Sequence, residues 1–361
     1  MPDQNIFSSL FVKAAKALLS VAEKDLPDIK KIKRVLVVRQ HNQFGDLLAS
    51  VPLFRAIKET LPESKLTVIT SPQNYYALTN NKFIDEQFIF DKDDIFNIEY
   101  LYKLITVLRQ GYDLVIVPVT VSISTTSCLL GRFARAHYRV GPKSLDGKEN
   151  FYSFLFHKRI NLNWSANPER YVADFGLDIL RPLGIYTNNF KSEITVEEYE
   201  NNTADKFINE ITVGENYKII GLHIGAGKPP NRWSIENFVN LCKKINQNFK
   251  TKFYVTGSSS DNNEIENFKQ RINFDCGFYL NKAIPELAAV ISKSDLFITN
   301  DTGVMHVAGA TETPQISLFG QTNPNNWAPI GVNKISIKKS NLINDIEVEE
   351  VYKKAEQFLN K

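Results

Sequence analysis

The chain has 361 residues, of which 43% are hydrophobic and 23% are charged, and its formal net charge is +3. This length is too great for one ordinary hydrophobic core and fits two domains of roughly 150 to 200 residues each. The composition excludes a disordered chain, and the weak net charge gives no indication of nucleic-acid binding.

Cysteine usage and the N-terminal segment bear on where the protein works. Cys128, Cys242 and Cys276 form no C-x-x-C pair, which favours a reducing compartment and argues against a zinc site. No apolar run reaches the roughly 18 to 20 residues needed to span a bilayer, and no cleavage pattern of a signal peptide is present. We therefore expect a cytoplasmic protein. Residues 6–22 predict an amphipathic helix, which can either lie on an anionic membrane surface or pack on its own domain.

Strands and helices alternate in the first half of the chain. The predicted strands are residues 33–39, 65–70, 88–90, 113–118 and 137–140, and the predicted helices are residues 47–61, 98–110 and 128–136. Short apolar runs between helical segments are typical of parallel strands that are buried on both faces. We predict a parallel sheet covered by helices on both faces.

A second alternating series begins at residue 218. Its predicted strands are residues 218–223, 252–256, 276–279 and 296–299, and its predicted helices are residues 234–248, 262–272, 284–292 and 304–310. A predicted helix at 171–183 and a turn-rich linker separate the two series. The sequence thus predicts an α/β protein with two doubly wound, Rossmann-like domains, at residues 1–190 and 191–345, followed by a helix at 346–361.

A polar loop follows the first strand, at the sheet edge where ligands bind in open parallel sheets. It ends in Gly45 and Asp46, at the start of a helix. Asp46 either complements the helix dipole or places one carboxylate at the mouth of a cleft.

Another loop follows the first strand of the second series. Gly225 and Gly227 permit close backbone approach, while Lys228 and Arg232 can neutralise a pyrophosphate. A G-x-G loop alone is weak evidence, so the interpretation depends on what surrounds it.

Residues 295–320 describe a strand, an abrupt polar turn, a short helix and a second strand. Gly303 follows Asp301 and Thr302, and the free N–H groups and positive dipole end of the following helix favour an anion. His306, on the first turn, can donate to a phosphate oxygen or bond back to the turn. The alternative is an ordinary capped turn with a core histidine.

This run resembles the signature of the bacterial heptosyltransferase family, glycosyltransferase family 9, through Asp301-Thr302-Gly303-x-x-His306-x-Ala308-Gly309-Ala310, Thr313-Pro314 and Leu318-Phe319-Gly320. Gly45-Asp46 and Arg232-Trp233 match two further motifs of the family. The resemblance implies a GT-B fold, with two Rossmann-like domains facing a cleft. It also implies inverting transfer of a sugar, commonly heptose from ADP-heptose, to a lipopolysaccharide core or a related lipid-linked glycan.

The resemblance also implies roles for individual residues. Asp46 would be the general base that takes the proton from the acceptor hydroxyl, with His41 as the second candidate. The donor phosphates would contact Lys228, Arg232, Asp301, Thr302, Gly303, Val304 and His306, and the nucleoside would contact Gly225, Ala226, Gly227, Gly257, Glu264 and Lys282.

The chain departs from the family pattern at Asn231, where the family usually has lysine. Lys228 or Arg232 can supply the missing charge. For the acceptor, Arg39, Lys143 and Arg170 are candidate contacts to phosphate or carboxylate groups.

We expect no metal and no cofactor, because no D-x-D motif follows a strand. The expected partners are a nucleotide-diphospho-sugar and a lipid-linked glycan, with peripheral contact to the cytoplasmic face of the inner membrane. In the GT-B fold the C-terminal helix typically packs back on the first domain. The alternatives are a non-catalytic nucleotide-sugar-binding protein, a family member that uses another donor sugar, and a GT-B sugar-nucleotide epimerase.

Overall fold

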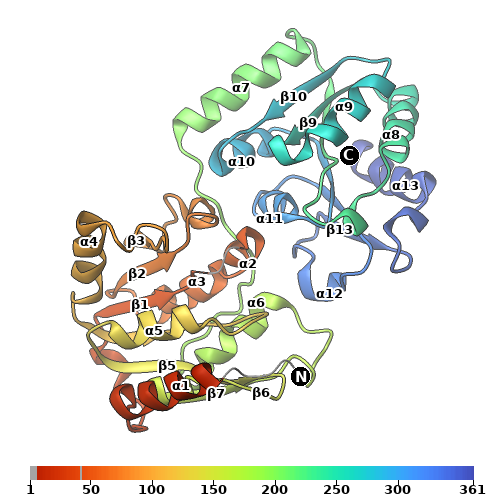
Figure 1. Cartoon of the computed structure of the whole chain (residues 1–361). Helices are drawn as coiled ribbons and strands as arrows, with labels where there is room; N and C mark the ends of the chain where they lie inside the picture. The colour runs from red at the N-terminus through yellow and green to blue at the C-terminus, as the bar shows by residue number, and fades with distance from the viewer. Residues whose placement is uncertain (1–5, 41–42) are drawn as a thin grey trace. The chain divides into compact units, whose positions relative to one another are not determined.

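The computed structural model describes residues 6–40 and 43–361 (Figure 1). Contacts between residues divide the chain into two compact units, Met1–Phe190 and Lys191–Lys361. Each unit contains one mainly parallel sheet with helices packed on it. The predicted α/β class with two doubly wound domains is therefore confirmed.

The sheet of the first unit has the strand order β3-β2-β1-β4-β5-β6, and β7 also pairs with β5. Its strands are β1 (Arg34–Val38), β2 (Lys65–Thr70), β3 (Glu86–Ile89), β4 (Tyr112–Ile116), β5 (Ala136–Leu145), β6 (Lys148–Glu149) and β7 (Lys158–Leu162). The central strand β1 pairs in parallel with β2 and β4, and its residues Val35 to Val38 are completely buried. This explains why the sequence shows a continuous apolar run there and no alternation.

The helices of the first unit are α1 (Ile6–Leu19), α2 (Phe44–Leu48), α3 (Val51–Thr60), α4 (Ile98–Leu108), α5 (Thr125–Phe133) and α6 (Val172–Gly176). Apolar residues of α1, α4 and α5 belong to one core cluster with β1 and β4. The N-terminal helix thus packs on its own unit through Val12, Ala15 and Leu19.

Two predicted helices of the first unit are interrupted. The helix expected at 47–61 is divided into α2 and α3, because Pro52 lies in the first turn of α3, the part of a helix where a residue without an N–H is tolerated. The helix expected at 171–183 continues beyond α6 only as two 3₁₀ turns, and Gly184 ends the second of them with a φ of 73°.

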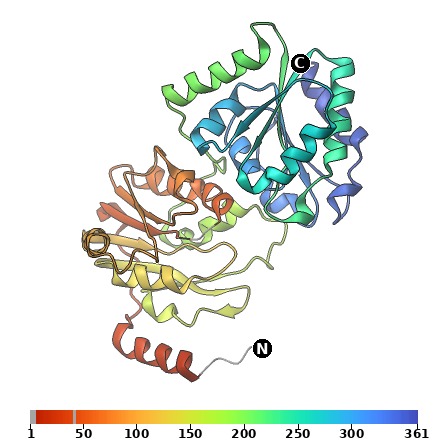
Figure 2. The same cartoon turned by 45° about the horizontal axis from the view of Figure 1, so that its top comes forward.

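The sheet of the second unit is parallel throughout, in the order β10-β9-β8-β11-β12-β13. Its strands are β8 (Lys218–His223), β9 (Thr251–Gly257), β10 (Cys276–Leu280), β11 (Leu296–Asn300), β12 (Gln315–Phe319) and β13 (Lys334–Lys338). Its helices are α7 (Glu198–Thr212), α8 (Ile235–Asn248), α9 (Asn262–Arg271), α10 (Ile284–Ser292), α11 (Gly303–Gly309), α12 (Pro324–Trp327) and α13 (Val348–Leu359). Helices lie on both faces of this sheet (Figure 2).

Helix α7 was not predicted, since its residues fall partly in the expected linker. Only Ala204 and Thr212 of this helix are buried, so its sequence carries a weak apolar stripe. A capping box between Glu197 and Glu200 marks its start.

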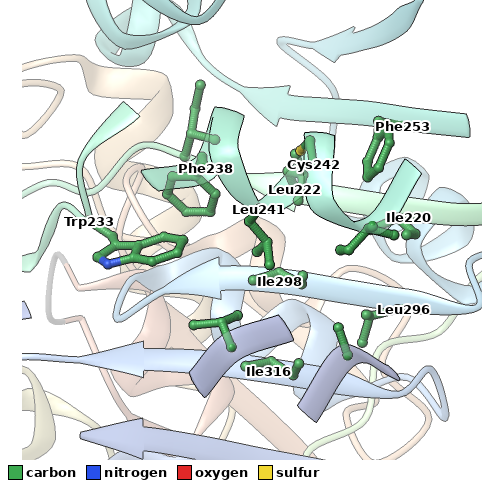
Figure 3. Packing of buried hydrophobic residues seen from close by; sticks show 14 of the residues in the cluster. Ile220, Leu222, Trp233, Phe238, Leu241, Cys242, Phe253, Leu296, Ile298 and Ile316 are labelled. Atoms are coloured by element: carbon green, nitrogen blue, oxygen red, sulfur yellow. The ribbon is translucent and has the colours of Figure 1, made fainter. Parts of the chain in front are cut away.

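The core of the second unit is built from the central strands and from α8 and α13. Figure 3 shows Trp233, Phe238 and Leu241 beside Ile298 of β11. The same cluster includes Val351, Tyr352, Ala355, Phe358 and Leu359 of α13. The apolar face of α13 is therefore buried by α8 and the sheet of the second unit, and packing of this helix on the first domain stays a prediction.

No helix in the described part of the chain is long and apolar enough to cross a membrane.

Replacing Val351 with alanine tests the assignment of α13 to the second core. Val351 is completely buried, so the loss of two methyl groups should lower the free energy of unfolding by roughly 2 kcal/mol. Denaturant unfolding measures this change. Gln357→Ala, on the exposed side of the same helix, should leave the stability within about 0.5 kcal/mol; equal stabilities of the two variants would contradict the assignment.

Candidate active site

The carboxyl end of β1 carries the candidate base of the first unit. Asp46 lies in the first turn of α2, and 6% of its surface is exposed. Its backbone carbonyl accepts a hydrogen bond from Ser50 Oγ at 2.7 Å. The carboxylate is thus held on a short helix at the sheet edge where ligands bind in this fold.

Arg39, the residue after β1, connects the start of α3 to the segment that follows β4. Its Nε donates to Ser50 Oγ at 3.2 Å, and its Nη2 donates to Thr120 Oγ1, beyond the end of β4, at 2.8 Å. Burial lowers the pKa of the Arg39 guanidinium, and the charge of Asp46 acts in the opposite direction. Arg39 is therefore a buried cation close to the candidate base and is no surface contact for an acceptor. His41 lies outside the described residues.

Two other candidate acceptor contacts can be placed. Arg170 is bound by the carboxylates of Asp174 and Asp178, which Arg181 also bridges. Its charge is therefore already balanced within the first unit. Lys143, in contrast, is exposed on β5.

In the second unit, the loop after β8 is fastened to the end of β11 by one buried side chain. The Nδ2 of Asn300 donates to the carbonyls of Ile224 and Gly225, at 3.0 and 3.2 Å. Its Oδ1 accepts the backbone N–H of Trp233 at 3.1 Å. Asn300 is completely buried, so both ends of the loop are fixed beside the Asp301-Thr302-Gly303 turn.

Position 225 has no room for any side chain larger than that of glycine. A Cβ at this position would lie 2.0 Å from Oδ1 of Asp261, well inside van der Waals contact. Gly227, by comparison, has open space around it. Gly257 is also confined, since a Cβ there would lie 2.7 Å from Ile265.

Asn231 joins the same loop to the turn after β11. Its Nδ2 donates to Oδ2 of Asp301 at 2.9 Å, and the side chain is nearly buried. Burial raises the pKa of the Asp301 carboxyl, while a hydrogen bond with Thr322 and the charge of Lys228 act in the opposite direction. Lys228 therefore lies close enough to Asp301 to interact with its charge. The position where the family usually has lysine is thus used to hold the turn, with Lys228 as the neighbouring cation.

Arg232 is turned toward Glu264. The two side chains form an ion pair, and Arg232 Nε donates to the carbonyl of Ala226 at 2.8 Å. Arg232 and Glu264 therefore hold the loop after β8 against the start of α9. Lys228 is the more exposed of the two candidate cations.

Helix α11 begins at the Asp301-Thr302-Gly303 turn, and Lys334 contacts its carboxyl end. Thr302 is its N-cap residue and makes no side-chain capping hydrogen bond. At the other end, Nζ of Lys334 donates to the carbonyls of Ala308, Thr311 and Thr313, at distances of 2.6 to 2.9 Å. Burial lowers the pKa of Lys334 to about 8. A cation at the carboxyl end of a helix complements its dipole, so Lys334 fixes α11 against β13.

His306 is 7% exposed and lies with its ring 6.3 Å from that of Trp327. Burial lowers the pKa of His306 to about 4. The imidazole is therefore neutral at pH 7 and can offer an N–H or a lone pair to a ligand, without a positive charge.

Of the remaining nucleoside candidates, Lys282 pairs with Glu286 at 3.5 Å and lies over the ring of Tyr279. Lys282 is thus held by residues of its own segment, between β10 and α10. Within residues 6–40 and 43–361, no group of three or more His, Cys, Asp or Glu side chains is placed to hold a metal ion.

Sequence reasoning missed three residues that organise this site: Asn300, Asp261 and Lys334. A signal existed for Asn300, which directly precedes the Asp-Thr-Gly run at the end of a buried strand. Asp261 follows Ser258 by three residues, and its Oδ2 accepts the Ser258 N–H at 2.8 Å, as in a capping box. Lys334 gave no signal, because its partners are 21 to 26 residues away.

The pKa of His306 predicts how stability depends on pH. The unfolded chain binds a proton at this histidine below about pH 6.5, whereas the folded chain does so only near pH 4. The contribution of neutral His306 to the free energy of unfolding is complete above pH 6.5 and is lost as the pH falls toward 4. His306→Gln should therefore unfold in urea with a weaker dependence on pH between 7.5 and 4.5. His137→Gln, at an exposed position, should keep the wild-type dependence; an unchanged slope in His306→Gln would contradict the neutral assignment.

Comparisons with known proteins show which family the sequence matches. The profile of glycosyltransferase family 9 (heptosyltransferase) matches residues 101–355. The chain is 29% identical to lipooligosaccharide heptosyltransferase 2 of Haemophilus influenzae, over 79% of this chain and 83% of that protein. It is 24% identical to lipopolysaccharide heptosyltransferase 3 of Escherichia coli, over 81% of this chain and 85% of that protein.

Solved structures give the same fold. A glycosyl transferase of family 9 from Veillonella parvula aligns with a TM-score of 0.79 and 20% identity, over 93% of this chain and 99% of that one. The E. coli ADP-heptose lps heptosyltransferase II aligns with a TM-score of 0.72 and 20% identity, over 90% and 98% of the two chains. The family profile covers more than half of the sequence, so the chain belongs to glycosyltransferase family 9, the heptosyltransferase family.

Proposed function

We propose that the protein transfers heptose from ADP-heptose to a lipopolysaccharide core or a related lipid-linked glycan, with inversion at the anomeric carbon. Membership of family 9 and the names of the matched relatives support the reaction class. The observation that carries the proposal is the joining of the loop after β8 to the Asp301-Thr302-Gly303 turn by Asn300 and Asn231. These contacts bring the glycine-rich backbone and Lys228 to one place.

In this proposal the donor diphosphate lies at the Asp301-Thr302-Gly303 turn. Thr302 and the backbone N–H groups of Gly303 and Val304 would bind its oxygens, and Lys228 would balance its charge. His306 would contribute a neutral hydrogen bond, which agrees with its lowered pKa. Arg232 would act mainly through Glu264, by fixing the loop that carries Gly225 to Gly227.

The nucleoside would lie along the loops after β8, β9 and β10. The backbone of Gly225, Ala226, Gly227 and Gly257 would line its pocket, with Glu264 near the ribose hydroxyls and Lys282 near the base. Glu264 is held by Arg232 and is only slightly exposed, so its orientation is set before a ligand arrives.

Asp46 would be the general base. An inverting transfer needs one base to remove the proton of the acceptor hydroxyl as that oxygen attacks the anomeric carbon and the bond to the β-phosphate breaks. The negative charge that develops on the phosphate would be stabilised by the N–H groups of α11 and by Lys228. In this scheme neither a metal nor a cofactor is required.

We further propose that the protein works in the cytoplasm, at the cytoplasmic face of the inner membrane. The cysteines at 128, 242 and 276 are free, in agreement with a reducing compartment. A lipid-linked acceptor would bring the enzyme to the membrane surface.

Asp46→Asn tests the base. It keeps the size of the side chain and removes its ability to accept a proton, so kcat should fall by about 10²- to 10⁴-fold while the affinity for ADP-heptose stays within a factor of about two. Release of ADP in the presence of acceptor measures kcat, and calorimetry measures donor binding. Asp25→Asn, on the surface of the same unit, is the matched control; wild-type turnover by Asp46→Asn would remove the proposed role.

The same assay separates the alternatives. A non-catalytic binding protein would bind the donor without acceptor-dependent release of ADP. A member that uses another sugar would be stabilised more by a different nucleotide sugar in a thermal-shift series. An epimerase would convert the donor without any acceptor.

Lys228→Met tests the cation that stands in for the lysine absent at position 231. Loss of one charge-assisted contact to a diphosphate should weaken ADP binding by about tenfold, and the deficit should shrink as salt is raised. Lys243→Met, exposed on α8, provides the comparison. If both variants bind ADP as the wild type does, Lys228 has no part in the donor site.

A further inference from the structure

The first unit carries an apolar groove that the proposed chemistry does not use. It has a volume of about 420 Å³ and lies between α4 and α5. Its walls include Leu101, Leu104 and Ile105 of α4 and Leu129, Leu130 and Phe133 of α5. Its size falls in the range of small-molecule sites, and its lining is almost entirely hydrocarbon.

Large apolar side chains stand exposed around this groove. Phe96 is 94% exposed, Ile98 85% and Tyr102 73%, and Phe133 at the groove wall is 56% exposed. Single exposed apolar residues are common, but several that neighbour the lining residues of one apolar groove in the chain favour an interaction surface. We call the groove and these four residues the α4–α5 patch.

The helices around the patch are basic. Helices α1, α4 and α5 contribute to the same core cluster and so cover one face of the sheet. Residues 6–19, 98–109 and 125–135 contain only one acidic residue, Glu99, against six basic ones: Lys13, Lys16, Lys103, Arg109, Arg132 and Arg135. The loop before α4 adds three aspartates and one lysine at residues 91–94. The layer as a whole remains positive.

We propose that the α4–α5 patch docks on a lipid bilayer that contains anionic lipid, with Phe96 and Ile98 inserted and a lipid chain in the groove. The inference rests on the proposed function in one respect: a lipid-linked acceptor would itself lie in that bilayer. Exposed apolar side chains on a layer of positive net charge are a composition that binds anionic membrane surfaces, and here the positive charge comes from the helices and not from the loop that carries Phe96. A second copy is a poor occupant, because two positive layers would face each other in a symmetric dimer.

The proposal assigns the membrane contact to a different element from the N-terminal helix. Val12, Ala15 and Leu19 of α1 pack inward against the sheet of its own unit, whereas Leu18 is 80% exposed. Helix α1 then contributes charge through Lys13 and Lys16, which are exposed, while the insertion comes from the start of α4 and the loop before it.

Co-sedimentation of the full chain with vesicles tests this docking without donor or acceptor, so that its result is independent of the proposed reaction. The wild type should bind vesicles of phosphatidylethanolamine with phosphatidylglycerol and should bind phosphatidylcholine vesicles weakly. F96S/I98S should bind the anionic vesicles about tenfold or more weakly, since two inserted side chains are lost. R109Q/R135Q should bind them about 30-fold more weakly, because each charge near the surface is worth about 1 kcal/mol.

Val332→Ser with Leu342→Ser is the matched control, because both residues are highly exposed apolar side chains of the second unit. It should bind like the wild type. Phe96 and Ile98 are so exposed that their replacement should leave the unfolding temperature unchanged. Failure of the wild type to bind anionic vesicles, or equal binding by F96S/I98S, would overturn the proposal. So would self-association of the wild type that F96S/I98S abolishes, since the patch would then be a contact between copies.

Discussion

The buried amide of Asn300 is the interaction on which the second unit's site depends. It satisfies two carbonyls and one N–H of the loop after β8 from the end of β11. A buried backbone group left without its hydrogen bond costs about 1–3 kcal/mol. Separation of the loop from the Asp301 turn would therefore break three of these hydrogen bonds. Asn231 adds a second connection between the same segments. The proposed donor site is preorganised because its backbone is fixed by side chains that are themselves buried.

The departure from the family pattern at position 231 has a physical explanation in these contacts. Asn231 is nearly buried and donates to Asp301, whose pKa is raised by burial. A short neutral amide fits this position, and Lys228 provides a charge nearby. Arg232 is the weaker substitute, because Glu264 already pairs with it. The positive charge near the turn thus comes from Lys228 and not from position 231. The proposed diphosphate binding would depend on this one exposed lysine and on backbone N–H groups.

The first unit combines two features that a lipid-linked acceptor would need. The candidate base Asp46 is held beside the buried Arg39 at the carboxyl end of β1. The α4–α5 patch belongs to the same unit and to helices that cover its sheet. If the patch enters a bilayer as proposed, the position of α2 relative to the bilayer would also be set, because the same sheet carries α2 and the helices of the patch. Acceptor capture and proton removal would then be functions of one folded unit, with the donor assigned to the other.

The sequence by itself determined the fold class, most of the strands and helices, and the family, because apolar periodicity and short motifs are local properties. It also identified Asp46, Lys228 and the Asp301-Thr302-Gly303 run as candidates. Only the tertiary structure decided that α13 completes the second core, that Arg232 faces Glu264 and that His306 is neutral. The reason is physical: burial and charge pairing depend on partners tens of residues away, and a local pattern contains no information about which distant side chain removes water from a given group.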